Sequence, residues 1–190
     1  MKKPGAAVTV DFNGDFYRII TMSRGMMSYA EPGAEPIYLD PHVDDDSLGK
    51  ALREALAKSR QVSVEDFQRI FRSGVVQKLG KEREALAMEK YGYKTRRAML
   101  KKMDTCSVSV VENQIEIQPT HQKSLDGWTV TKDEGPFPLY VPGTATDADL
   151  GAALREGFKR TSLYTSQVTP YESRTYKGSS GGIAPSLLQA

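Results

Sequence analysis

The stretch DDSLGKALRE at residues 45–54 returns at residues 147–156 as DADLGAALRE. The match extends without a gap when residues 25–60 are laid on 127–162, and 11 of the 36 positions are identical. Average composition would give roughly two or three identities over that length. We therefore interpret the chain as a tandem duplication of one supersecondary unit, with copies at 8–60 and 108–162.

Each copy ends in an amphipathic helix. Apolar residues recur at i, i+3, i+4, i+7 and i+8 from Leu48 to Leu56 and again from Leu150 to Phe158, so each helix is expected to lay one face on a sheet. Gly49 and Gly151 lie in the first turns, where glycine costs about 1 kcal/mol relative to alanine. A cost met twice at one place predicts close packing of helix on helix across a pseudo-two-fold axis.

Charged residues also stand at matching places in the two helices. Asp45 and Asp147 are placed to cap the free N–H groups of the first turn or to stabilise them as first-turn carboxylates. Arg53-Glu54 and Arg155-Glu156 are expected to be solvated on the outer faces.

The segments before the helices show strand patterns. Apolar residues alternate from Val8 to Phe12, Asn13-Gly14 predicts a type I′ turn with positive φ at both residues, and 16–22 returns as a partner strand. The second copy repeats this hairpin over 108–117 with a weaker turn at Asn113-Gln114. Short strands are expected next, at 26–29, 37–39, 128–131 and 139–141. These patterns predict an α+β fold of two repeated halves, each with about four strands and then a helix on the sheet.

A helical insertion, 63–104, separates the halves. Ser63 with Asp66 forms a capping box for a first helix, a second is expected around Glu82 to Tyr91, and the third, Thr95 to Met103, is basic. The Met and aromatic residues of the whole insertion are expected to lie in the hydrophobic core.

The chain as a whole has the composition of an ordinary soluble globular protein. It holds 190 residues with 39% hydrophobic and 26% charged residues, and its charges leave no apolar run of about 20 residues for a membrane span. We expect a single domain over 1–168, a flexible tail over 169–190, and a cytoplasmic location. The lone Cys106 fits a reducing compartment, and we expect it to be buried.

Charge is segregated along the chain. Residues 81–102 carry eight basic residues and three Glu, whereas 31–46 carries six carboxylates and no Lys or Arg. Two solvated faces are the plain interpretation, and docking on a charged partner is the functional one. The six carboxylates are Glu31, Glu35, Asp40, Asp44, Asp45 and Asp46.

Catalytic motifs are scarce. Gly178-Xaa-Ser180-Xaa-Gly182 has no His or acidic residue after it, which excludes the triad order of the nucleophile elbow. Gly74 to Lys81 has the wrong spacing for a P-loop. His42 beside the acidic run has no second His or Cys nearby, so a metal or acid–base site there is disfavoured. We predict no catalytic residue, no metal site and no cofactor.

The repeated Leu-Gly-Xaa-Ala-Leu-Arg-Glu helix after a Pro-Ile-Tyr-Leu strand, together with Gly92 to Leu100 leading to Met103 and Cys106, resembles the immunity proteins of bacterial contact-dependent growth inhibition, the CdiI family. The resemblance spans roughly residues 8 to 165. It implies a cytoplasmic, non-enzymatic protein that binds the C-terminal toxin domain of a cognate CdiA, commonly a nuclease, and blocks its active site or substrate path.

Two function classes follow. The first is a toxin inhibitor whose acidic run meets the basic substrate channel of a nuclease. Asp44 and Asp46 are then the expected contacts, with Asp40, Glu35 and Glu31 near them. The second is a nucleic-acid-binding or regulatory module using helix 95–103, for which Tyr91 and Tyr93 are the candidate stacking residues. We favour the inhibitor.

Overall fold

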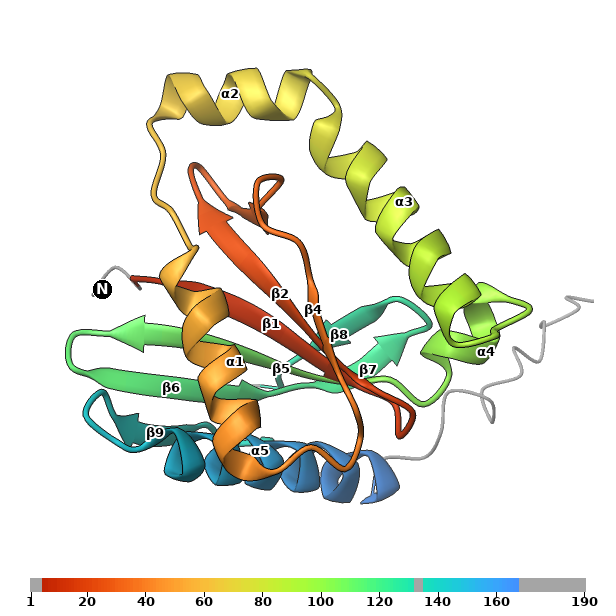
Figure 1. Ribbon diagram of the computed structural model, residues 1–190, viewed down its shortest axis with the longest axis vertical. Coiled ribbons are helices and arrows are strands. Elements are labelled where there is room, and N and C mark those ends of the chain that lie inside the picture. Colours follow the sequence, from red (N-terminus) through yellow and green to blue (C-terminus); the bar gives the residue numbers. More distant parts are fainter. Residues whose placement is uncertain (1–4, 132–134, 168–190) are drawn as a thin grey trace, which may run out of the picture.

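Helices and strands occupy most of the chain that the structure describes. This structure is a computed structural model, and it describes residues 5–131 and 135–167, with side chains as far as residue 161. The elements, shown in Figure 1, are β1 (Ala7–Phe12), β2 (Tyr17–Arg24), β3 (Ser28–Ala30), β4 (Ile37–Leu39), α1 (Asp45–Ala57), α2 (Val64–Arg72), α3 (Val75–Lys90), α4 (Arg96–Leu100), β5 (Asp104–Val111), β6 (Gln114–Pro119), β7 (His121–Ser124), β8 (Gly127–Thr129), β9 (Leu139–Pro142) and α5 (Asp147–Gln167).

Seven strands form one antiparallel sheet in the order β3-β2-β1-β5-β6-β9, with β4 also paired to β2. The hairpins β1–β2 and β5–β6 meet at its centre, where Val8 lies opposite Val108. Strands β7 and β8 form a separate two-stranded sheet. Helices and an antiparallel sheet together confirm the predicted α+β class.

Helices α1 and α5 pack on one face of the large sheet, and α1 crosses in front of it in Figure 1. The strands send alternate apolar side chains toward them, as the period of two requires. Cys106 belongs to this core, and burial raises the pKa of its thiol. The fully or almost fully buried core residues include Val8, Val10, Ile19, Leu48, Leu52, Val108, Ile117, Leu150 and Leu154.

The first turns of α1 and α5 touch through their glycines. A Cβ on Gly49 would lie 1.8 Å from the carbonyl oxygen of Asp147, and a Cβ on Gly151 would lie 2.0 Å from that of Asp45. No side chain fits at such a distance. The predicted close approach of the two helices is confirmed, and it explains why both helices carry a glycine that weakens them locally.

The two hairpins differ from the prediction in their turns. Phe12 pairs with Tyr17, so a four-residue loop replaces the expected type I′ turn, and Gly14, with φ at 94°, has positive φ in it whereas Asn13 does not. The side-chain amide of Asn13 donates to the Tyr93 hydroxyl at 2.9 Å, which ties this loop to the segment just before α4. The tight turn is in the second hairpin, one residue earlier than expected, with Glu112 at a φ of 57°.

The short strands match only in part. Strands β4 and β9 are equivalent in the repeat, and each pairs with the second strand of its own hairpin. In contrast, β3 joins the edge of the large sheet, whereas β8 pairs with β7 outside it. The two halves, which were expected to be similar, therefore differ in the pairing of this strand.

The insertion forms the predicted helices with altered lengths. Ser63 caps α2 by accepting from the backbone N–H of Asp66, as predicted. Helix α3 begins at Val75, earlier than expected, and the half-buried residues Val75, Val76 and Leu79 of its first turns were not recognised as a helical pattern. The expected tail, 169–190, lies outside the described residues. A second core joins α3 and α4 to the first hairpin through Phe16, Ala87, Met99, Leu100 and Met103.

Candidate functional site

Three of the predicted contact residues lie together where β4 leads into α1. Asp40 is exposed and accepts from the backbone N–H of His42 at 2.8 Å. Asp44 is exposed and caps α1, accepting from the backbone N–H of Ser47 at 2.7 Å. That hydrogen bond lowers the pKa of Asp44, so its carboxylate stays charged near neutral pH. Asp46 is exposed in the first turn of α1, so this segment presents three carboxylates to solvent.

The expectation that Asp45 caps α1 is wrong, because the cap is the residue before it. Asp45 lies inside the helix and accepts from Nε of Arg155 at 2.6 Å. In the second copy the equivalent place before the helix is taken by Thr146, whose hydroxyl accepts from the backbone N–H of Asp149 at 3.1 Å.

The expectation that Arg53 and Arg155 are solvated charge is also wrong. Nε of Arg53 on α1 donates to Asp147 on α5 at 2.7 Å, which mirrors the pair of Arg155 with Asp45. Each guanidinium also donates to a backbone carbonyl before the partner helix, Ala145 for Arg53 and Val43 for Arg155. The two arginines therefore tie the helices together reciprocally.

Glu31 does not belong to the exposed surface. It is 2% exposed, and its carboxylate accepts from Arg60 at 2.6 Å and from the backbone N–H of Gly33 at 3.0 Å. Burial raises the pKa of Glu31, but the hydrogen bonds from Arg60, Ser23 and Gly33 outweigh it, and the pKa falls below its ordinary value. The structure gives Glu31 a role in fixing the chain after β3.

Glu35 lies before β4, apart from the Asp40–Asp46 segment. Its side chain is 80% exposed but pairs at 3.0 Å with Arg83 of α3. Arg83 itself is nearly buried and also donates to the carbonyls of Pro32 and Ala34. This contact anchors α3 on the loop between β3 and β4, so Glu35 is accessible and already partly neutralised.

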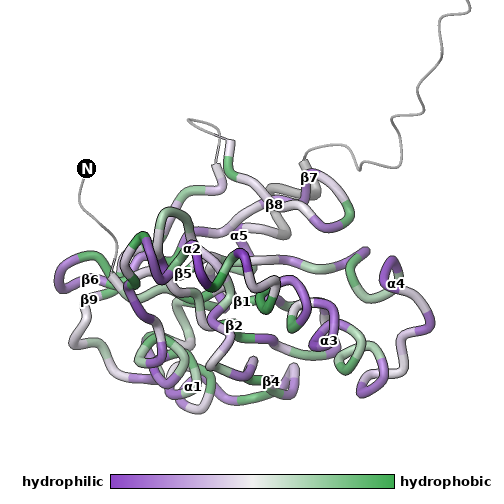
Figure 2. Tube along the Cα trace, turned by 90° about the horizontal axis from the view of Figure 1, so that it is seen from above, coloured by the Kyte–Doolittle hydropathy of each residue, from purple (hydrophilic) through white to green (hydrophobic). Residues whose placement is uncertain are grey.

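The basic region is less free than its charge indicates. Arg96 of α4 pairs with Glu84 at 2.7 Å and with Asp126 at 3.0 Å. The two tyrosines that could stack on bases are engaged as well: Tyr91 stacks on Phe16 with centroids 4.1 Å apart, and Tyr93 donates to Asp15. Helix α4 lies at the end of the molecule away from the turn of β5 and β6 (Figure 1). Its trace is hydrophilic only in part (Figure 2), because Met99 and Leu100 are apolar and buried.

Among residues 5–131 and 135–167, no group of three or more His, Cys, Asp and Glu side chains is arranged to hold a metal ion. His42 is exposed, close in sequence to these carboxylates. None of the helices in the same ranges is long and apolar enough to cross a membrane.

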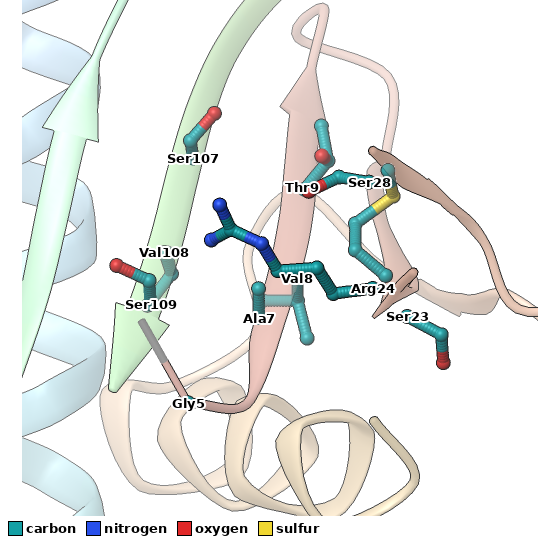
Figure 3. Close-up of a pocket in the computed structure, with 11 residues that line it drawn as sticks. Gly5, Ala7, Val8, Thr9, Ser23, Arg24, Ser28, Ser107, Val108 and Ser109 are labelled. Atoms are coloured by element: carbon teal, nitrogen blue, oxygen red, sulfur yellow. The ribbon is translucent and has the colours of Figure 1, made fainter. Parts of the chain in front are cut away.

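The face of the sheet turned away from α1 and α5 carries a hollow of about 250 Å³ that no sequence motif indicated. Arg24 extends from β2 across β1 toward Ser107 and Ser109 on β5 (Figure 3). Thr9 and Ser28 supply further hydroxyl groups. The pattern that could have indicated the hollow is the alternation in β1 and β5. It places small hydroxyl residues on the sheet face that the buried valines do not use.

Comparison with known proteins agrees with the resemblance seen in the sequence. Residues 6–161 match the CdiI family, described as CDI immunity protein. The Immunity protein CdiI-YPIII of Yersinia pseudotuberculosis serotype O:3 (strain YPIII) is 27% identical over 167 residues, which cover 82% of this chain and 94% of that protein.

Two solved structures share the fold. A protein of unknown function, NMB0488 from Neisseria meningitidis, matches with a TM-score of 0.74 and 23% identity, covering 84% of this chain and 96% of that one. A chain of the CdiA-CT/CdiI toxin and immunity complex from Yersinia pseudotuberculosis matches with a TM-score of 0.73 and 25% identity. The match covers 82% of this chain and 96% of that one. Since the family match covers most of its length, the chain belongs to the CdiI family of CDI immunity proteins.

Proposed function

We propose that this chain binds the C-terminal toxin domain of a cognate CdiA effector in the cytoplasm and neutralises it without catalysis. The carrying observation is its similarity, over 96% of that chain, to a component of a CdiA-CT/CdiI toxin and immunity complex. A rigid core under both helices gives the preformed surface on which tight protein inhibitors depend.

We further propose that the toxin is a nuclease and that the chain occludes its active site with the carboxylates of Asp40, Asp44 and Asp46. A nuclease channel is basic because it holds a phosphate backbone, and exposed carboxylates oppose such a surface. Glu31 is removed from this proposal by its burial, and Glu35 contributes less because Arg83 pairs with it. Asp149 adds to the same surface, because it is exposed in the first turn of α5, which touches that of α1.

The function is tested with a cognate toxin domain, sought as the C-terminal domain of a CdiA encoded beside this chain. We expect the chain alone to leave DNA and RNA intact, and we expect it to abolish nuclease activity of the toxin at a one-to-one ratio. Toxin that stays active at a twofold excess of the chain contradicts neutralisation, and inhibition by a small fraction of one equivalent contradicts a non-catalytic inhibitor.

The acidic surface is tested by the double substitution Asp44→Asn and Asp46→Asn. Asn caps a helix about as well as Asp, so the charge is removed while α1 keeps its cap. We expect the association rate to fall roughly 3- to 10-fold at low salt and to converge with that of the wild type at high salt. The control Glu65→Gln with Glu89→Gln removes two exposed carboxylates from α2 and α3. Equal effects of the two double variants, or no effect of the first, would remove this surface from the interface.

A further inference from the structure

We propose that the hollow on the outer face of β1, β2 and β5 seats an acidic side chain of the toxin, with Arg24 as its binding residue. This inference rests on the proposed function and adds a second contact to it. The hollow lies on the sheet face opposite α1, whereas the acidic surface surrounds the start of α1. The two contacts can therefore be tested separately.

Arg24 is the reason to expect an anion. Its guanidinium extends over the hollow toward Ser107 and Ser109 (Figure 3), and it forms no ion pair with any residue that the structure describes. The lining contains no Asp or Glu, and its hydroxyl groups come from Thr9, Ser28 and the two serines of β5. A planar guanidinium binds a carboxylate through two parallel hydrogen bonds, and hydroxyl donors beside it can bind the same oxygens.

The size of the hollow favours a side chain over a cofactor. Its volume of about 250 Å³ lies below the range of about 300–1,000 Å³ that is usual for small-molecule sites. Ala7 and Met22 supply apolar side chains to the lining, so the methylene groups of a Glu or Asp would contact apolar atoms while its carboxylate reached Arg24. One acidic side chain on a partner's surface fits both the volume and the chemistry.

The rim favours a protein partner over a nucleic acid. The turn that joins Arg24 to Ser28 carries Met26 and Met27, which are 65% and 56% exposed. Flexible thioether side chains of this kind suit an apolar protein surface, and exposed large apolar residues mark interaction sites. A nucleic acid would require several cations and aromatic platforms, and the lining offers one cation and no aromatic residue.

The test measures the dissociation constant between this chain and the cognate toxin domain used to test the proposed function. Arg24→Glu is expected to raise the dissociation constant at least about 30-fold, because it sets one carboxylate against another. Arg24→Lys keeps the charge but loses the paired geometry, so a smaller increase of about 3- to 10-fold is expected. Ser107→Phe fills the hollow without changing charge and is expected to weaken binding as well.

The matched control is Lys81→Glu, which makes the same charge change at an exposed site on α3. It is expected to change the dissociation constant less than about twofold. Thermal unfolding of every variant, with a Tm near that of the wild type, shows that the fold is intact. If the wild type binds toxin and Arg24→Glu binds it equally well, the inference is overturned while the proposed function stands. If Arg24→Glu instead loses binding to a single-stranded oligonucleotide with toxin binding unchanged, the hollow serves nucleic acid, and the inference is equally overturned. A wild type that does not bind toxin refutes the proposed function itself.

Discussion

Gly49 on α1 faces the backbone carbonyl of Asp147 on α5 so closely that even a methyl group would overlap the oxygen. The reverse contact, from Gly151 to the carbonyl of Asp45, has the same geometry. The two helices are thus held backbone to backbone, and the space between them is set by the absence of two side chains.

Gly49→Ala is expected to lower the free energy of unfolding by about 3 kcal/mol or more, because the added methyl must push one helix away from the other. Urea denaturation followed by circular dichroism measures this loss. Gly80→Ala is the matched control: Gly80 lies in α3 with no heavy atom within 4 Å of the added Cβ, so alanine there is expected to stabilise by about 0.4–1 kcal/mol. Equal effects at the two glycines would refute the tight crossing.

Arg155→Met is expected to lower the free energy of unfolding by about 1.5–3 kcal/mol, since it leaves Asp45, the Val43 carbonyl and the Tyr17 hydroxyl without their donor. Arg155→Lys separates charge from geometry. If the fork of donors matters, lysine restores less than half of the loss; full recovery by lysine would show that charge alone is sufficient.

The lowered pKa of Glu31 predicts that the free energy of unfolding falls in acid. Its pKa in the folded protein lies below the ordinary 4.5, so its contribution is fully present above that pH and is lost as the pH falls through the folded value. Glu31→Gln is expected to lower the free energy of unfolding by about 1–2 kcal/mol at pH 7 and by less at pH 3. Parallel curves for the two proteins across that range would contradict the depressed pKa.

Asp44→Ala is expected to cost about 1 kcal/mol through loss of the cap of α1, whereas Asp44→Asn is expected to be nearly neutral. Thermal unfolding of both variants at neutral pH and moderate salt checks this order. If both substitutions cost the same, the charge of Asp44, rather than its cap hydrogen bond, would be its contribution.

Local patterns predicted a large part of this fold. The stripe from Leu48 to Leu56 placed α1 and the alternation from Val8 to Phe12 placed β1, because each depends on neighbours within one or two turns or strands. The helix crossing is a long-range contact, and it was predicted because the repeat puts a glycine at the same place in both helices. The duplication of 8–60 and 108–162 remains our proposal. Superposition of the two halves tests it, with β3 and β8 already known to differ.

Long-range contacts between individual side chains were the part that the sequence could not predict. Arg53 and Asp147 are 94 positions apart, and nothing in either helix alone distinguishes a paired arginine from a solvated one. Asn13 was misassigned for a similar reason: its bonds to Tyr93 and to the Met99 carbonyl come from the insertion. Burial of Glu31 likewise depends on Arg60, which follows α1.

The reciprocal arginines have a consequence for how the protein is made. Helix α1 leaves the ribosome long before α5, and Arg155 follows Arg53 by about 100 residues, a delay of roughly 5–20 s at usual rates of synthesis. For the first half of that interval β1 lacks its neighbour β5, and until α5 is made the first turn of α1 lacks the backbone of α5 that packs on it. A truncated chain that ends before α5 therefore cannot complete its core, and under the proposed function a newly made molecule can bind toxin only after α5 has been translated.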